Sequence, residues 1–249
     1  MGKLQNKVAV ITGGNSGIGL TSAQTFINEG AKVVIFGRNQ QSLDEAVETL
    51  GPNAYSVQGD VSKLEDLERL KKETEDKFGN VDILFVNAGL GVFAPLDQID
   101  EAAYDKQFDI NVKGAFFTVQ KFQSIMNENS SVILTASAVH EKGVPTGSLY
   151  FATKAAVRSL SRTLAAELAP QKIRVNTLSP GIVRTQFADK TNLSNEDFEG
   201  FIEMVASQAP LQRAGTTQEI ANGALFLASD ESAYMTAADL LIDGGWMSI

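Results

Sequence analysis

Short, fully apolar runs alternate with longer amphipathic segments along most of this 249-residue chain. The runs Val8–Ile11 and Ile83–Val86 carry an apolar side chain at every position instead of alternating apolar and polar ones. That pattern is typical of a strand whose two faces are both covered by helices, as in a parallel sheet. We therefore predict an α/β fold with a doubly wound parallel sheet of the Rossmann type, in three α/β/α layers.

The expected strands follow one another along the chain with helices between them. We expect strands at Val8–Ile11, Lys32–Phe36, Ala54–Val57, Val81–Val86, Ser131–Thr135 and Ile173–Leu178. We expect helices at Gly17–Asn28, Gln40–Leu50, Leu64–Phe78, Ala102–Met126 and Tyr150–Leu168. Because no low-complexity or proline-rich linker interrupts the series, residues 1–249 are predicted to form a single domain.

Residues 182–215 depart from this rhythm. The segment is polar and irregular at first and then continues into a short predicted helix at Glu196–Ser207. It leaves the carboxyl end of a strand, where doubly wound sheets bind their ligands. We therefore predict a lid over a binding site, with an ordinary surface insertion as the alternative.

The composition excludes several classes of protein and site. A net charge of -9 argues against a nucleic-acid partner, which requires many lysines and arginines against its phosphates. The chain has no cysteine and only one histidine, His140, so we expect no disulfide, no thiolate catalysis and no metal site. No apolar run approaches the roughly 18 residues of a membrane span. We expect no membrane partner and a cytoplasmic location, since no signal peptide is apparent.

A glycine-rich loop, Thr12–Gly19, lies between the first expected strand and the first expected helix. Gly13 permits a tight turn, Gly17 lets the backbone approach a pyrophosphate, and Gly19 lets the helix pack closely on the strand. The amides at the helix N-terminus supply the local positive potential that an acidic protein lacks. We therefore predict a dinucleotide site that includes Gly13, Asn15, Ser16, Gly17, Ile18 and Gly19.

The end of the second strand indicates which dinucleotide is preferred. An acidic residue there would bind the ribose hydroxyls of NAD, but this chain has Gly37 followed by Arg38. Arg38 can pair with a 2′-phosphate, although it could also be a solvated arginine at the start of a helix. We predict NADP(H) as the preferred cofactor, with NAD(H) possible because Asn15 adds no second cation.

Two further groups of residues follow strands at the same edge of the sheet. Asp60, before Val61, could hold the adenine amino group or cap the next helix, although Ser62 is the better cap candidate. Asn87, Ala88 and Gly89 end the fourth strand, where small residues would let the backbone lie against a ribose. Asn87 could instead only stabilise the turn.

The candidate reactive residues are Tyr150 and Lys154, which share one face of a helix at i, i+4 spacing. A neighbouring ammonium favours phenolate, so Lys154 is expected to lower the pKa of Tyr150. Ser137 follows the fifth strand, where its hydroxyl can donate to a substrate oxygen. Asn111 either bonds within its own helix or marks a kink that holds a relay water behind Lys154.

In order and spacing, these motifs resemble the short-chain dehydrogenase/reductase family over essentially the whole chain. The motifs are Thr12–Gly19, Asn87-Ala88-Gly89, Asn111, Ser137, Tyr150-x-x-x-Lys154, Pro180-Gly181 with Thr185, and Ile242-Asp243-Gly244-Gly245. One small departure is Val86, where many members have an asparagine.

The resemblance implies a catalytic tetrad of Asn111, Ser137, Tyr150 and Lys154. It also implies that Tyr150, Lys154, Pro180, Gly181 and Thr185 contact the cofactor, with Thr185 on the nicotinamide carboxamide. It favours Asp60 and Val61 as adenine contacts, and it implies a homotetramer.

From these motifs we expect an oxidoreductase that transfers a hydride between NADP(H) and a ketone or secondary alcohol, as in carbonyl reductases. The small-molecule substrate is expected in a mainly apolar pocket formed by Leu90, Val139, His140, Val144 and Phe187. His140 could instead be a solvated loop residue. A 3-oxoacyl-[acyl-carrier-protein] reductase is the enzymatic alternative and needs basic residues such as Arg158, Arg184 and Arg213 near the mouth. A non-catalytic NADP-sensing protein is the alternative from another class.

Overall fold

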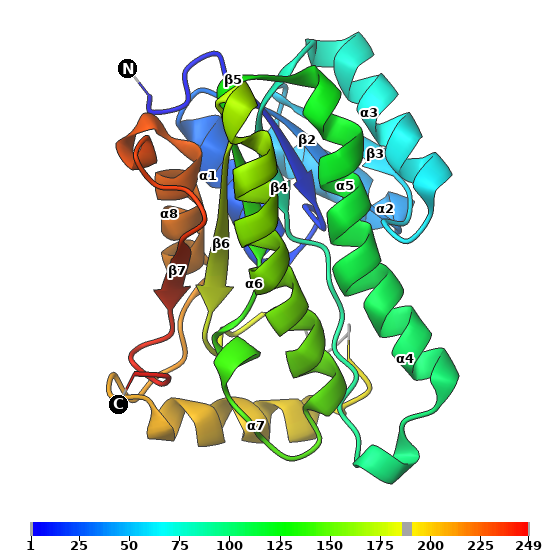
Figure 1. Cartoon of the computed structure of the whole chain (residues 1–249), viewed down its shortest axis with the longest axis vertical. Helices are drawn as coiled ribbons and strands as arrows, with labels where there is room; N and C mark the ends of the chain where they lie inside the picture. Colours follow the sequence, from blue (N-terminus) through cyan, green and yellow to red (C-terminus); the bar gives the residue numbers. More distant parts are fainter. Residues whose placement is uncertain (1, 186–190, 249) are drawn as a thin grey trace.

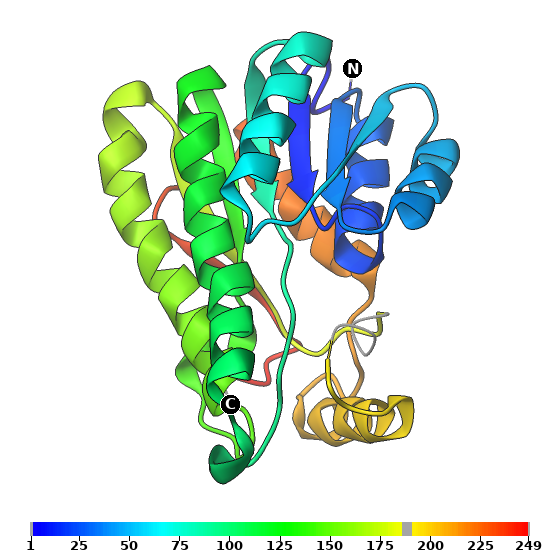
Figure 2. The ribbon, with the colours of Figure 1, turned by 90° about the vertical axis from the view of Figure 1, so that its right-hand side faces the viewer.

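Seven parallel strands form one sheet in the computed structural model, which describes residues 2–185 and 191–248. Their order across the sheet is β3-β2-β1-β4-β5-β6-β7. The strands are β1 (Val8–Thr12), β2 (Lys32–Gly37), β3 (Ala54–Gln58), β4 (Val81–Val86), β5 (Met126–Thr135), β6 (Arg174–Pro180) and β7 (Asp239–Ile242). Helices cover both faces of the sheet (Figures 1 and 2), so the predicted doubly wound α/β fold is confirmed.

The direction in which the chain adds strands reverses between β1 and β4. The chain runs outward from β1 to β3 and then returns to place β4 on the other side of β1, with Thr12 paired to Val86 at their carboxyl ends. At such a reversal the connections leave toward opposite faces and open a crevice at the carboxyl edge. The two motifs expected to bind the cofactor, after β1 and after β4, therefore lie side by side.

Alternate side chains of each strand enter two different cores. In β1, Val8 and Val10 face one core, whereas Ala9 and Ile11 face the other. The first core is closed by α3 (Leu64–Phe78), α5 (Gly114–Phe122) and α6 (Ser148–Leu168). The second is closed by α1 (Gly17–Asn28), α2 (Gln40–Leu50) and α8 (Thr217–Ala228). None of the helices in the described ranges is both long and apolar enough to cross a membrane.

A third apolar cluster lies beyond the carboxyl edge of the sheet. There α7 (Asn195–Gln208) crosses below the strand ends (Figure 1), close to the helix expected at Glu196–Ser207. Its Val205 packs with Val139, Phe151 and Trp246. The described part of the segment 182–215 therefore covers the edge where the ligand site is expected.

Several elements differ from the expectation. The helix expected at Ala102–Met126 is α4 (Glu101–Phe108), a π-helical turn (Asp109–Lys113) and α5, and β5 already begins at Met126. The strand β7 was not anticipated, because four residues are too short for a clear pattern. The helix α8 was also missed, although its capping box between Thr216 and Glu219 is a recognisable start signal.

The tightest backbone approach in the glycine loop is at Gly19, and it yields a stability prediction. A Cβ at Gly19 would lie 2.2 Å from the carbonyl oxygen of Gly13, which belongs to the backbone and cannot rotate away. We expect Gly19→Ala to lower the free energy of unfolding by about 1–3 kcal/mol, measured by urea unfolding without cofactor.

Gly200→Ala in α7 is the matched control, since nothing lies within 4 Å of a Cβ at that position. This substitution should raise the free energy of unfolding by up to about 1 kcal/mol, because alanine favours the helix. Equal midpoints for Gly19→Ala and the wild type would refute the close approach.

Candidate active site

The glycine turn presents the N-terminus of α1 to a cavity at the carboxyl edge of the sheet. Gly13 and Gly17 have φ angles of +65° and +53°, which side chains other than glycine rarely adopt. Ser16 is the N-cap of α1, yet its side chain makes no capping hydrogen bond. Ser16, Gly17 and Ile18 all line the cavity, so the first-turn amides face the space where a phosphate would bind.

Asn87 joins the end of β4 to this turn. Its Nδ2 donates to the carbonyl oxygens of Thr12 and Gly13, each at 3.2 Å. The amides of Asn87 and Ala88 both donate to Thr12 Oγ1, at 3.0 and 3.1 Å. Asn87 therefore stabilises the turn, and it also lines the cavity together with Gly89.

A second cavity lies at the ends of β2 and β3 and continues from the glycine turn. Arg38 is exposed at its rim, and its guanidinium has no hydrogen-bond or ion-pair partner among the residues that the structure describes. The end of β2 carries no acidic side chain, and Asn15 lies against it: a Cβ at Gly37 would be 2.6 Å from Asn15 Oδ1. A guanidinium at this position can form a bidentate pair with an anionic group.

Asp60 and Val61 line this second cavity, as do Ala88 and Gly89. Asp60 Oδ1 accepts hydrogen bonds from the amide and the hydroxyl of Ser62, at 2.9 and 2.8 Å. The N-cap of α3 is Lys63, so the expectation that Ser62 caps this helix was wrong. Ser62 instead closes a turn on Asp60, which keeps the Asp60 side chain at the cavity.

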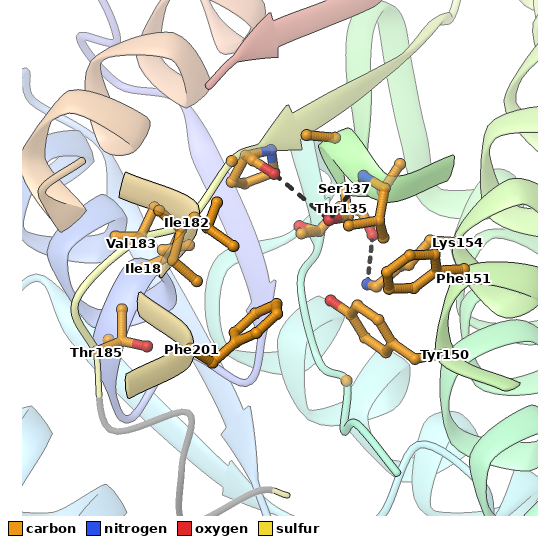
Figure 3. Close-up of a pocket in the computed structure, with 18 of the residues that line it drawn as sticks. Ile18, Thr135, Ser137, Tyr150, Phe151, Lys154, Ile182, Val183, Thr185 and Phe201 are labelled. Atoms are coloured by element: carbon orange, nitrogen blue, oxygen red, sulfur yellow. Dashed lines mark hydrogen bonds between the residues drawn. The ribbon is translucent and has the colours of Figure 1, made fainter. Parts of the chain in front are cut away.

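The candidate catalytic side chains meet in the first cavity (Figure 3). Ser137 follows β5, while Tyr150 and Lys154 lie one turn apart near the start of α6. The side chains of Tyr150 and Ser137 are hydrogen-bonded to each other. Lys154 Nζ donates a 2.9 Å hydrogen bond to the carbonyl oxygen of Thr135 at the end of β5. Two hydroxyl groups and one ammonium group thus share a single cavity.

Asn111 lies in the π-helical turn between α4 and α5 and is buried. Its Nδ2 donates to Leu90 O at 2.9 Å and to Thr153 Oγ1 at 3.0 Å, and its Oδ1 accepts from the Leu90 amide at 3.0 Å. The interpretation that Asn111 bonds only within its own helix is therefore wrong. Its side chain ties the loop after β4 to α6, and a relay water behind Lys154 stays a prediction.

Burial controls the protonation of the two central groups. It raises the pKa of Tyr150 to about 12, and the hydrogen bond with Ser137 opposes this rise only in part. Burial also lowers the pKa of Lys154 to about 8. The expected lowering of the Tyr150 pKa by Lys154 is not found, because the ammonium bonds to Thr135 and lies 5.6 Å from the centre of the phenol ring. Tyr150 is thus held as a neutral phenol, which is the form that donates a proton.

Aromatic side chains form the outer wall of the cavity. The Phe93 ring lies 5.3 Å from the ring of Tyr150 and 6.3 Å from that of Phe201, centre to centre. Trp246, near the end of the chain, is 5% exposed, and its Nε1 donates to Gln208 Oε1 at 3.2 Å. Among the described residues that line this cavity, Lys154 is the only charged one.

Asn192 joins the segment 182–215 to this wall. Its Oδ1 accepts from the amide of Phe93 and its Nδ2 donates to the carbonyl oxygen of Phe93, both at 2.8 Å. Pro180, Gly181 and Thr185 lead from β6 into the segment and line the cavity. A Cβ at Gly17 would lie 3.6 Å from Thr185 Cγ2, so Thr185 sits directly against the glycine turn.

The residues expected in the substrate pocket are only partly brought together. Val139 lines the first cavity, whereas Leu90 lines the second one, because the loop after β4 turns it toward the π-helical turn. Val144 packs on the outside of the third apolar cluster. The His140 side chain is 8% exposed and faces Asp239, so it is neither at the substrate mouth nor solvated. Phe187 lies outside the described residues.

The sequence and the fold are similar to those of known oxidoreductases. A family model described as enoyl-(acyl carrier protein) reductase matches residues 13–247. The chain is 43% identical to oxidoreductase asL5 of Sarocladium schorii, over 99% of this chain and 98% of that protein. It is 35% identical to galactitol 2-dehydrogenase of Agrobacterium fabrum, over 99% of this chain and 100% of that protein.

A solved structure from Brucella melitensis, titled short-chain dehydrogenase/reductase SDR:glucose/ribitol dehydrogenase, has a TM-score of 0.92 to this chain. The two are 30% identical, and the match covers 99% of each chain. This chain belongs to the short-chain dehydrogenase/reductase family. It is therefore an NAD(P)-dependent oxidoreductase that acts on CH–OH or C=O groups.

Sequence reasoning missed several residues that line the active-site cavity of this short-chain dehydrogenase/reductase. The missed residues are Phe93, Phe151, Ile182, Phe198, Phe201, Val205 and Trp246. Phe198 and Phe201 were visible as aromatic residues within the segment 182–215, but nothing placed them on its inner side. Trp246 follows a glycine pair near the chain end, and no local pattern indicates that it returns to the site.

The low pKa of Lys154 leads to a prediction on stability. In the unfolded chain the pKa returns toward 10.5, so between about pH 8 and pH 10 the unfolded state binds more protons at Lys154 than the folded state does. The free energy of unfolding of the wild type should therefore rise with pH in this window. Relative to Lys154→Met, the gain between pH 7 and pH 10 should be on the order of 2–3 kcal/mol.

Urea unfolding at a series of pH values measures this difference. Lys106→Met, on the exposed surface of α4, is the control and should follow the wild type at every pH. Ionisation of Tyr150 in the unfolded chain lowers the free energy of unfolding with rising pH, but only above about pH 10. This effect is the same in all three proteins. Parallel curves for the wild type and Lys154→Met would mean that the ammonium is not buried.

Proposed function

We propose that this short-chain dehydrogenase/reductase transfers a hydride between NADP(H) and an uncharged ketone or secondary alcohol. The observation that carries the proposal is the neutral, partly buried Tyr150, which is hydrogen-bonded to Ser137 in a mainly apolar cavity beside the glycine turn. A phenol in that state is a proton donor for an oxygen that gains negative charge.

In the direction of reduction, the hydroxyls of Ser137 and Tyr150 donate hydrogen bonds to the substrate carbonyl oxygen. The bound cofactor supplies the hydride that the carbonyl carbon receives. As charge develops on the oxygen, Tyr150 transfers its phenolic proton to it, and Ser137 continues to stabilise the oxygen. Lys154, with a pKa of about 8, then favours reprotonation of the phenolate at neutral pH. Asn111 holds the loop after β4 and α6 in the positions that this chemistry needs.

The chain offers a matching group for each part of NADP(H). The amides of Ser16, Gly17 and Ile18 would hold the pyrophosphate, and Arg38 the 2′-phosphate. Asp60 and Val61 would contact the adenine. Toward the nicotinamide, Tyr150 and Lys154 would bind the ribose hydroxyls, and Thr185 the carboxamide, beside Pro180 and Gly181.

The cavity favours an apolar substrate over an acyl group on a carrier protein. The carrier reading needs free basic side chains at the mouth, but Arg184 pairs with Glu199, and Arg213 pairs with Glu219 at 2.5 Å. Arg158 donates to Ser161 and to the carbonyl oxygen of Ala237 inside the fold. A non-catalytic sensor would have no use for a buried phenol and ammonium in one cavity, so we prefer an enzyme.

We also propose that the segment 182–215 acts as a lid. Asn192 accepts a hydrogen bond from the Phe93 amide, and the ring of Phe201 lies near that of Phe93, both at the cavity mouth. Thr185 lies directly against the glycine turn. A homotetramer is inferred from the family alone, and a cytoplasmic location is inferred from a sequence without cysteine.

The proposed reaction is tested by following NADPH oxidation with a panel of ketones. Acetophenone, an apolar ketone, should be reduced, whereas pyruvate should not, because no arginine lines the described part of the cavity to receive a carboxylate. Tyr150→Phe should lower kcat by about 10²–10⁴-fold, since the proton donor is lost. NADPH binding, followed by fluorescence titration, should weaken by no more than about tenfold, because only one hydrogen bond to the ribose is lost. Unchanged turnover in Tyr150→Phe would overturn the assignment.

The cofactor preference is tested at Arg38. Arg38→Ala should raise the KM for NADPH about tenfold and leave that for NADH nearly unchanged, because only NADPH carries the 2′-phosphate. Adding Gly37→Asp should shift the preference further toward NADH, provided that Asn15 rotates away from the new carboxylate. Lys106→Ala, on the exposed surface of α4, serves as the control for a lost surface charge. Equal kcat/KM ratios for the two cofactors in the wild type and Arg38→Ala would refute the role of Arg38.

A further inference from the structure

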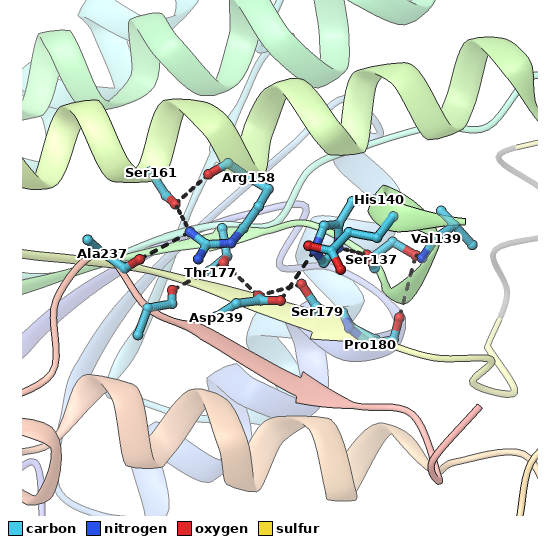
Figure 4. A network of polar contacts seen from close by, with 12 residues as sticks. Ser137, Val139, His140, Arg158, Ser161, Thr177, Ser179, Pro180, Ala237 and Asp239 are labelled. Atoms are coloured by element: carbon cyan, nitrogen blue, oxygen red, sulfur yellow. Dashed lines mark hydrogen bonds and ion pairs between the residues drawn. The ribbon is translucent and has the colours of Figure 1, made fainter. Parts of the chain in front are cut away.

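The single histidine of the chain lies between the active-site serine and a partly buried carboxylate. His140 belongs to the 3-10 helix Ala138–Glu141, which begins directly after Ser137. Its Nδ1 is within hydrogen-bond distance of the carbonyl oxygen of Ser137. Its Nε2 lies 3.5 Å from Asp239 Oδ2 (Figure 4). The same nitrogen lies 3.7 Å from Glu141 Oε1.

Both ring nitrogens of His140 therefore face groups that only accept hydrogen bonds. A neutral imidazole has one N–H donor and one lone pair, so either tautomer would direct a lone pair at an oxygen. With Nδ1 donating to Ser137, a bare Nε2 would face the Asp239 carboxylate. Only the doubly protonated ring has a donor for each of these oxygens.

The Asp239 carboxylate is held firmly on its other side. Its Oδ1 accepts hydrogen bonds from the hydroxyls of Thr177 and Ser179, both at 2.6 Å. The guanidinium of Arg158, on α6, is near enough to Asp239 and Glu141 to interact electrostatically with both. The charged groups around the ring are thus Asp239 from β7, Glu141 from the same helix as His140, and Arg158 from α6.

The Ser137 hydroxyl, in contrast, is held to the two strand ends by long contacts. Besides its hydrogen bond with Tyr150, it contacts the carbonyl oxygen of Pro180 at 3.5 Å and accepts from the amide of Val139 at 3.4 Å. The chain from His140 through Asp239 to Ser179 links the turn after β5 to the end of β6, one residue before Pro180. It therefore spans the two strand ends between which the Ser137 hydroxyl lies.

We propose that His140 is a positioning residue: its protonated ring, held between the Ser137 carbonyl and the Asp239 carboxylate, keeps the Ser137 hydroxyl directed at the substrate oxygen. Loss of the ring proton leaves a lone pair facing the carboxylate and loosens the turn at Ser137. Turnover therefore falls as His140 loses its proton with rising pH, while the KM changes little. This inference rests on the proposed function only for the part that concerns turnover.

The ring itself is observed by NMR, and no assignment problem arises because the chain has one histidine. In ¹⁵N-histidine-labelled protein without ligands, both ring nitrogens should be protonated at low pH and one proton should be lost in a single step. Asp239→Asn should move that step to lower pH, because the facing negative charge is gone. Glu141→Gln is the matched control, and since Glu141 is largely exposed it should move the step much less. A step that Asp239→Asn leaves in place would overturn the proposal, whatever the substrate is.

The kinetic arm uses kcat measured across the same pH range. In the wild type, kcat should fall where the NMR signal reports loss of the ring proton, and Asp239→Asn should move both midpoints together. His140→Ala should lower kcat about tenfold at low pH. It should also remove the fall of kcat with rising pH, which is the limb of the profile assigned to the ring. His140→Asn restores an N–H donor near the Ser137 carbonyl without a titrating ring, so it should recover most of kcat and still lack the limb.

These outcomes separate positioning from a merely structural role. If His140→Ala lowered the urea midpoint but left kcat and its pH profile unchanged, the proposal would be overturned. A wild type that reduced no ketone would refute the proposed function, and the NMR step with its response to Asp239→Asn would still decide how the ring is placed.

Discussion

The removal of water from Tyr150 and Lys154 is the constraint on which the rest of the site depends. Both side chains leave the same face of α6 and enter a cavity where burial shifts both pKa values toward the neutral forms. In water, an ammonium beside a phenol would favour phenolate. Here the ammonium is directed at the carbonyl oxygen of Thr135, so the phenol keeps its proton. The site is therefore built as a proton donor before any ligand enters.

The same constraint explains why the sheet edge is rich in backbone contacts. A buried ammonium needs an acceptor, and the end of β5 provides one with Thr135. A chain with a net charge of -9 also needs local groups to attract a dinucleotide phosphate. In the proposed function, the N-terminus of α1 and the exposed Arg38 supply them at two separate points. Backbone dipoles and one arginine can thus attract phosphate locally, although the overall negative charge repels it.

Local patterns predicted the parts of this fold that depend on short-range chemistry. The sequence predicted strands β1 and β4 because they are fully apolar. It predicted the turn around Gly13, Gly17 and Gly19 because the glycine spacing has a single physical cause. The strand β7 and the cavity position of Trp246 were not predicted, because both follow from packing against elements distant in the sequence. The π-helical turn at Asn111 was expected only as a kink, because its side-chain partners, Leu90 and Thr153, are far apart along the chain.

His140 shows why side-chain roles are harder to read than motifs. Its place three residues after Ser137 suggested the substrate mouth, yet the 3-10 helix turns the ring inward toward β7. The contacts of this 3-10 helix therefore join three strands that carry separate sequence motifs. Ser137 follows β5, Pro180 ends β6, and Asp239 begins β7. Directly after this 3-10 helix, Lys142 places its ammonium 3.9 Å from the centre of the Trp246 ring. The short loop after Ser137 therefore braces both the proton-donor side and the apolar wall, and a change in it would alter positioning and substrate fit together.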